Sequence, residues 1–135
     1  MHCNGQLSLE YLLLLAAVLG IFSLLLPLLN NVFAASLFGL DSVNAKRFSQ
    51  QLQQAVEETS FQADGAATLI EAEPLGKWRL FSEKETLFIL VSGPSQREKG
   101  FEVVFPNPVV LETTISHKTV FVLRKHDARI LLEHN

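Results

Sequence analysis

The feature that most constrains the fold of this chain is an uncharged, strongly apolar run over residues 11–40. Its first part, residues 11–29, has 19 residues and is interrupted only by Gly20, Ser23 and Pro27. A bilayer core needs about 20 apolar residues in a helix, whose backbone amides pair within the segment. The run therefore predicts a transmembrane helix over about residues 11–29.

Formal charge divides the chain into two parts, because Glu10 is the only Asp, Glu, Lys or Arg before Asp41. The net charge is −3 and the hydrophobic share is 48%, a balance that excludes a disordered charged tail. Basic residues are interspersed with acidic ones after Asp41, so no nucleic-acid surface is predicted. A length of 135 residues is about one domain, which argues against a multidomain enzyme.

Three other interpretations of the apolar run stay open. One is a buried core helix, but the polar rest of a 15.0 kDa chain is too small to cover an apolar helix of this length on every side. A secretory signal peptide has a small-residue site at 33–36, but the basic n-region is missing and the run exceeds the usual apolar length of about 7–15 residues. A lipoprotein anchor on Cys3 would follow only two residues and no apolar segment.

Glu10 is a carboxylate placed one residue before the apolar run. A lone charge near hydrocarbon costs roughly a few kcal/mol, so it usually has a partner or a function. Cleavage between Gly5 and Gln6 would create an α-amino group four residues before Glu10. Copies of the helix that pack with a stagger could pair this amine with a neighbour's carboxylate, and only the correct stagger would neutralise both charges.

The residues from Gly5 to Leu12, followed by the apolar run, resemble the class III signal peptide of archaeal type IV pilin-like proteins. The family pattern is Q-x-S-x-E-Y/F-L, and this chain matches it at Gln6, Ser8, Glu10, Tyr11 and Leu12. The leader lacks the lysine or arginine that such leaders usually carry. Its removal would also take away Cys3, the only cysteine, so the mature chain could form no internal disulfide bond.

The resemblance implies cleavage after Gly5 by a prepilin-peptidase-like protease that recognises these five residues and leaves Gln6 as the new N-terminus. It implies that Gln6 and Glu10 act in assembly with other pilin subunits, in a homo- or hetero-oligomeric filament. An assembly ATPase and a membrane platform protein are the other implied partners.

Pro27 predicts a bend or a melted turn, because it lacks an N–H and its ring clashes with the carbonyl of Ser23. Neighbouring helices and a serine hydroxyl can repair such bonding in membranes. In pilin-like proteins a proline at a similar place marks a segment that unwinds when the filament forms, so the resemblance implies the same role for this helix kink.

Beyond the span, apolar residues continue at helical spacing and predict an amphipathic helix that packs on a sheet. They are Phe33, Leu37, Leu40, Phe48, Leu52, Ala55 and Val56. The wet face is expected to hold Asp41, Lys46, Arg47, Gln50, Gln51, Gln53, Gln54, Glu57 and Glu58. A continuous helix is expected from about Leu7 to Phe61, with Gly65 as its stop signal.

From Ala66 onward the apolar period falls toward two, which predicts a meander of short antiparallel strands. The expected strands cover residues 67–73, 77–82, 86–92, 101–105, 109–116, 119–125 and 128–133. The last three are expected to form consecutive hairpins. The predicted fold is α+β, a long N-terminal helix packed on this sheet in a type IV pilin-like layout.

No catalytic motif is present, and no enzyme activity, cofactor or metal is predicted. His117, His126 and His134 lack the close spacing of metal ligands. The polar stretch at 93–100 is expected to be an exposed loop, where an adhesive contact could lie.

The expected domains are a cleaved leader at 1–5, a helix at 6–64 with its span at 11–29 and its amphipathic half at 33–61, and a β domain at 66–135. The predicted function is a major or minor pilin of an archaeal type IV pilus-like surface filament. Its precursor would cross the membrane once, with the leader in the cytoplasm and the β domain outside. The alternative is a membrane-anchored extracellular β-domain binding module that does not polymerise.

Overall fold

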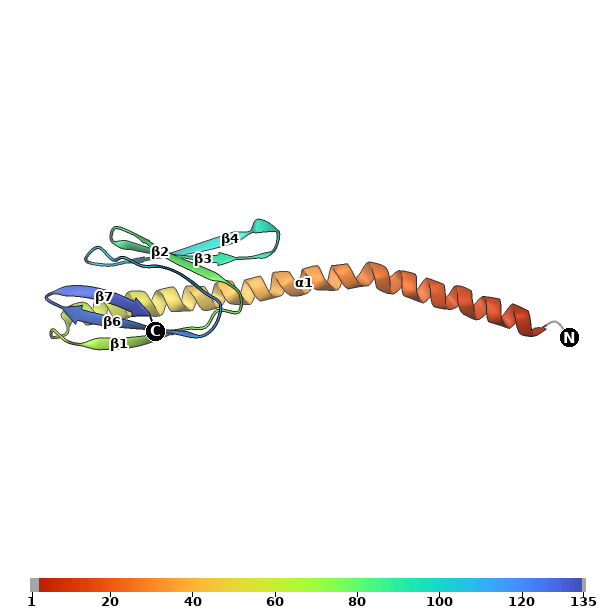
Figure 1. Ribbon diagram of the computed structural model, residues 1–135, viewed down its shortest axis with the longest axis horizontal. Coiled ribbons are helices and arrows are strands. Elements are labelled where there is room, and N and C mark those ends of the chain that lie inside the picture. Colours follow the sequence, from red (N-terminus) through yellow and green to blue (C-terminus); the bar gives the residue numbers. More distant parts are fainter. Residues whose placement is uncertain (1–2, 135) are drawn as a thin grey trace. The chain divides into compact units, whose positions relative to one another are not determined.

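The computed structural model describes the backbone of residues 3–134 and the side chains of residues 8–134. It has two compact units, Met1–Ala34 and Ala35–Asn135, and one α-helix, α1 (Cys3–Phe61), begins in the first and ends in the second (Figure 1). α1 begins earlier than Leu7 but ends at Phe61 as predicted. A turn then leads to Gly65, whose φ of +91° is one that glycine adopts without strain.

The first unit is helical throughout its described part, and α1 stays α-helical on both sides of Pro27. The melted turn considered for this position is therefore not present. The hydroxyl of Ser23 donates to the carbonyl oxygen of Leu19 at 2.9 Å. This bond does not replace the donor that Pro27 lacks, because it leaves the carbonyl of Ser23 without its usual partner.

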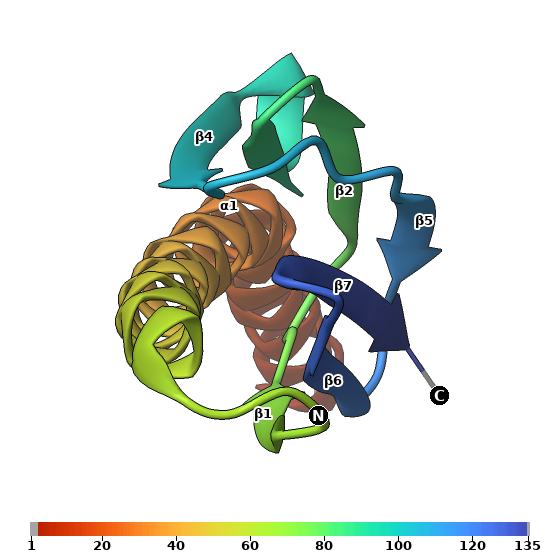
Figure 2. The same ribbon diagram turned by 90° about the vertical axis from the view of Figure 1, so that its left-hand side faces the viewer.

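The second unit holds seven antiparallel strands in two sheets (Figures 1 and 2). The three-stranded sheet has the order β1 (Ala67–Ala72), β6 (Thr119–His126) and β7 (Arg129–His134). The four-stranded sheet has the order β4 (Glu98–Val104), β3 (Thr86–Ser92), β2 (Trp78–Glu83) and β5 (Glu112–Ile115). Each predicted strand exists, and the α+β layout with antiparallel sheets is confirmed.

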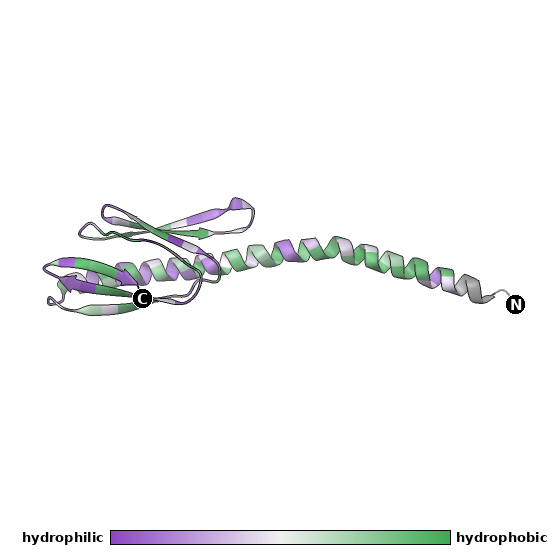
Figure 3. Cartoon of the chain, in the orientation of Figure 1, coloured by the Kyte–Doolittle hydropathy of each residue, from purple (hydrophilic) through white to green (hydrophobic). Residues whose placement is uncertain are grey.

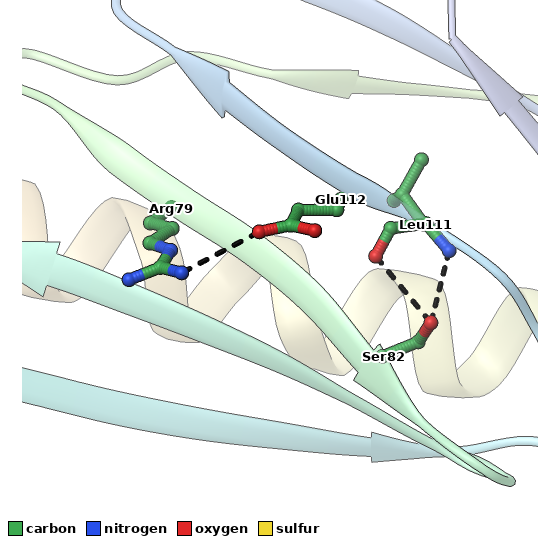
Figure 4. Close-up of polar contacts among 4 residues, drawn as sticks. All are labelled: Arg79, Ser82, Leu111 and Glu112. Atoms are coloured by element: carbon green, nitrogen blue, oxygen red, sulfur yellow. Dashed lines mark hydrogen bonds and ion pairs between the residues drawn. The ribbon is translucent and has the colours of Figure 1, made fainter.

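The predicted meander is wrong, because β1 pairs with β6 and β5 pairs with β2. Of the two hairpins expected among the last three strands, only the one between β6 and β7 forms. Ser82 fixes the other pairing, because its backbone N–H donates to the carbonyl of Leu111 at 2.9 Å. Its hydroxyl also accepts from the N–H of Leu111 at 2.9 Å (Figure 4). These bonds bring the segment before β5 onto the edge of β2 instead of beside β6.

The core lies between the C-terminal part of α1 and the two sheets. Phe48 of α1 lies at its centre, with ring centroids 5.9 Å from Trp78 and 5.4 Å from Phe121. The predicted buried stripe of α1 is confirmed at Phe48, Leu52, Ala55 and Val56. The same prediction is wrong at Phe33 and Leu37, which are 63% and 38% exposed and precede the covered part of the helix. It is also wrong at Leu40, which is 57% exposed because it projects from the side of α1 opposite to half-buried Phe38.

Asp41 was expected on the wet face of α1, but only 2% of it is exposed. One carboxylate oxygen accepts the N–H of Leu75 at 2.9 Å and the indole N–H of Trp78 at 2.7 Å. The other accepts the N–H of Gly76 at 3.0 Å. A Cβ on residue 76 would lie 2.8 Å from that oxygen, so only glycine at this position lets the backbone come close enough to the carboxylate. These bonds join α1 to the segment between β1 and β2.

The other end of α1 is joined to the three-stranded sheet by Lys125. Its ammonium group donates to the carbonyl oxygens of Ser60 and Gln62 at 2.8 and 2.7 Å. The last carbonyls of a helix have no partner inside the helix, so a cation at this place satisfies them.

The stretch at 93–100 was predicted to be an exposed loop, and residues 95–100 are exposed, but most of the stretch has regular structure. Pro94–Gln96 forms a 3-10 turn, and β4 already begins at Glu98. Gly93 lies against the ring of Phe38, where an added Cβ would come within 2.4 Å of the ring.

Replacing Asp41 with alanine should leave two backbone N–H groups and the indole N–H without their acceptor. We expect a loss of about 2–4 kcal/mol in the free energy of unfolding. Urea unfolding of the full chain in detergent, followed by the fluorescence of its single tryptophan, Trp78, measures this loss. Glu102→Ala removes an exposed carboxylate and should shift the urea midpoint little. An equal shift for both variants would contradict the role given to Asp41.

The turn between β6 and β7 holds Asp127 and Ala128 at φ values of +48° and +62°. This two-residue geometry favours glycine, and an ordinary L-residue there carries strain of about 1 kcal/mol. Ala128→Gly should therefore raise the free energy of unfolding, whereas Ala67→Gly inside β1 should lower it. Thermal unfolding of the two variants beside the wild type checks the opposite signs.

Candidate functional site

The most exposed apolar surface of the chain is the N-terminal half of α1. Every residue from Ser8 to Phe33 is exposed, and nearly all carry apolar side chains (Figure 3). Among the described residues, α1 is the one helix long and apolar enough to cross a membrane. A bare apolar helix of this length is stable only in lipid or against other apolar helices, and it is consistent with a single-pass anchor.

Glu10 lies at the start of this apolar surface and is exposed. Within residues 8–134, no side chain or backbone group forms an ion pair or hydrogen bond with its carboxylate. Its charge is therefore unbalanced by the described part of the chain. In an apolar medium this arrangement is unfavourable until a cation or a hydrogen-bond donor comes from outside.

The other described motif residues share one face of α1. Ser8, Tyr11 and Leu12 line one shallow hollow together with Leu15 and Val18, whereas Glu10 does not line it. At about 100° per residue, Glu10 projects from the opposite side of the helix.

The processing site predicted at Gly5 and Gln6 lies within the backbone of α1, while the side chains of these two residues are outside the described part of the chain. The peptide bond between them is therefore in helical conformation, one turn before Glu10. Met1 and His2 at the start of the leader also lie outside the described residues.

The histidines of the second unit are not brought together. His126 lies beside Asp127, with 3.4 Å between the ring nitrogen and a carboxylate oxygen, and the ring of His134 lies 6.1 Å from that of Phe121. Among the described residues, no group of three His, Cys, Asp or Glu side chains is placed to hold a metal ion.

Sequence reasoning missed the residues that join the elements of the second unit. Asp41 and Lys125 bind backbone groups of distant segments, as described above. Asn107 does the same: it accepts the N–H of Ile130 at 2.8 Å and donates to the carbonyl of Ile130 at 3.0 Å. Its position in the Pro106-Asn107-Pro108 corner indicated a turn but not its partner on β7.

Lys118 bridges two carboxylates beside β1. Its ammonium group contacts Glu71 and lies 3.2 Å from Glu73. The hydrogen bond to Glu71, followed by that to Glu73, raises the pKa of Lys118 above its usual value. These side chains are exposed, so the ion pairs contribute little to the free energy of unfolding.

Comparisons of this chain with protein-family models, with curated proteins and with solved structures found no match.

Proposed function

We propose that this chain is a pilin-like structural subunit of an archaeal type IV pilus-like surface filament. The observation that carries the proposal is Glu10, an exposed carboxylate without a partner in the described chain, at the start of a helix surface that is apolar and uncovered. A simple membrane anchor gains nothing from a charge at this place. A subunit that stacks on its copies gains a register from it.

The energetic argument rests on the medium around the helix. An unpaired carboxylate near hydrocarbon costs about 3 kcal/mol, and a wrongly staggered neighbour leaves that cost in place. Cleavage before Gln6 would supply an amine one helical turn from Glu10, so a neighbour in the correct stagger brings opposite charges together. Apolar packing then gives cohesion, while the charge pair selects one arrangement.

The second unit is suited to the outside of such a filament. Its core of α1 and two sheets contains no disulfide bond, because Cys3 is the only cysteine of the chain. In the proposed precursor α1 crosses the membrane once, with the leader in the cytoplasm. A prepilin-peptidase-like protease would remove residues 1–5, and a separate ATPase and platform protein would drive assembly.

The first test is the intact mass of the chain after co-expression with an archaeal prepilin peptidase, beside a sample made without it. We expect the loss of residues 1–5 alone, giving Gln6 as the N-terminus. An uncut chain would favour the membrane-anchored binding module. A cut near Ala35 would identify an ordinary secreted β domain, and either result contradicts the proposal.

The second test replaces Glu10 with glutamine, which keeps the size of the side chain and removes its charge. In the processed fraction, incorporation into filaments should fall by about tenfold or more, because the charge pair that selects the stagger is lost. Glu102→Gln, an exposed carboxylate on β4, is the matched control and should assemble normally. Quantitative immunoblotting of sheared filaments against membrane-retained subunit measures incorporation, and equal incorporation of both variants would refute the role of Glu10.

A further inference from the structure

The end of the second unit at which α1 enters carries an excess of basic side chains. Three segments that join strands lie at this end, at residues 73–77, 92–99 and 116–118, and we call them together the entry end (Figure 1). They hold four basic residues, Lys77, Arg97, Lys99 and Lys118, and two acidic ones, Glu73 and Glu98. The whole chain has a net charge of −3, so this basic excess is local.

Contacts inside the second unit place the three segments beside the start of its helical part. Asp41 accepts two backbone N–H groups of the first segment, as described above. The N–H of Ser92 donates to the carbonyl of Lys77 at 3.3 Å, and Gly93 lies against the ring of Phe38. The ion pairs beside β1 hold the third segment next to the first. The basic side chains are therefore gathered at one end of the unit.

Three of these cations have no anionic partner in the described chain. Lys77, Arg97 and Lys99 are exposed, and no carboxylate within residues 8–134 forms an ion pair with them. The ammonium group of Lys99 lies 5.8 Å from the ring centre of Phe101, a contact that does not neutralise its charge. An anion from outside the chain can therefore bind all three.

The opposite end of the second unit has no such excess. The turns at 83–86 and 126–129 lie where α1 stops (Figure 1). They hold three acidic residues, Glu83, Glu85 and Asp127, and two basic ones, Lys84 and Arg129. The unit is therefore electrically polarised, with its basic end next to the apolar run in the chain.

Apolar side chains are exposed beside the free cations. Leu75, two residues before Lys77, is 54% exposed, and Leu37, one helical turn before Asp41, is 38% exposed. Cations mixed with exposed apolar side chains are typical of protein surfaces that lie at the boundary of lipid headgroups and acyl chains. A soluble polyanion would use the cations but would leave the leucines in water.

The length of the apolar run brings the entry end to the level of the headgroups. The uncharged run at 11–40 is helical throughout, and at about 1.5 Å per residue it is about 45 Å long. The hydrocarbon core of a bilayer is about 30 Å thick, and the headgroup regions bring the total to about 40–45 Å. A helix that enters the bilayer at Tyr11 therefore leaves the headgroups near Asp41, where the second unit begins to pack on it.

We propose that the entry end binds the phosphate groups of anionic lipids. Lys77, Arg97 and Lys99 supply the positive charge, while Leu75 enters the headgroup boundary. The proposal rests on the membrane-held precursor of the proposed function, but it needs neither cleavage of the leader nor the charge of Glu10. The contact holds the second unit on the bilayer until the subunit is extracted.

The test is acetylation of lysines by a membrane-impermeant amine reagent, with the full chain held by α1 in nanodiscs. One set of nanodiscs contains phosphatidylcholine alone, and the other contains equal parts of phosphatidylcholine and phosphatidylglycerol. Lipid binding should slow the acetylation of Lys77 and Lys99 by about fivefold or more in the anionic set, because each basic residue at an anionic surface gains about this factor. Lys84, which is exposed in the β2–β3 turn, is the internal control and should react equally in both sets. Peptide mass spectrometry measures each site.

Equal rates at Lys77 and Lys99 in the two sets overturn the proposal and leave the proposed filament in place. Slowing of Lys84 to the same extent also overturns it, because the effect would then be general to the unit. If free glycerol phosphate slows the same two lysines in neutral nanodiscs, the cations bind a soluble anion and the lipid assignment is wrong. A chain that does not stay in the nanodiscs lacks the membrane-held state, and this result removes the precursor and the lipid contact together.

The double variant Lys77→Gln/Arg97→Gln sharpens the test, because it removes two of the three free cations. Acetylation of Lys99 in the anionic nanodiscs should then approach its rate in the neutral ones. The matched control, Lys84→Gln/Arg129→Gln, removes the same charge from the opposite end and should keep Lys99 protected. Trp78 fluorescence verifies that both variants are folded. Protection of Lys99 that persists in the first variant overturns the proposal, and the wild-type comparison decides it if this variant does not fold.

Discussion

The second unit depends on the bonds of one buried carboxylate. Asp41 is the first charged residue after Glu10, and its side chain is inside the protein, where it accepts two backbone N–H groups and the indole of Trp78. A buried carboxylate is tolerated only when its oxygens are bonded, so the segment between β1 and β2 must approach α1 at this residue. Trp78, which begins β2, is thereby held against Phe48. The sheets therefore pack on α1 from Asp41 toward its C-terminal end.

The same bonds explain why α1 has two different surfaces. Lys125 binds the C-terminal end of α1, and Asp41 binds the β1–β2 segment directly after the apolar run, so the covered part of α1 lies between about Phe38 and Ser60. Before Phe38, the described side chains are exposed or at most half-buried, although they are the most apolar of the chain. Their cover must come from lipid or from other chains, because the strands are already used on the other half of the helix.

Sequence reasoning found the elements but not the contacts between them. The helical spacing that predicted burial at Phe48 and Leu52 is set by the local backbone period and was right there. The same spacing at Phe33 and Leu37 carries no information on where the sheet ends, so burial was wrongly extended to them. Asp41 was placed in water because a lone acidic residue in a helix is usually solvated. Its donors come from a turn more than thirty residues away, which a periodic pattern cannot reveal.

Strand order was missed for a related reason. The turn at Pro106-Asn107-Pro108 shows that the chain reverses, but the edge it reaches is decided by Ser82 binding Leu111. Placing β5 on β2 instead of β6 divides the strands into two sheets, β1-β6-β7 and β4-β3-β2-β5, which share one core with α1. The polar groups that decide this order, Asp41 and Ser82, find their partners inside the chain. Glu10 is the opposite case, because no residue within 8–134 pairs with its carboxylate. In the proposed filament a neighbouring copy satisfies it, because every copy brings the amine that the next one's Glu10 lacks.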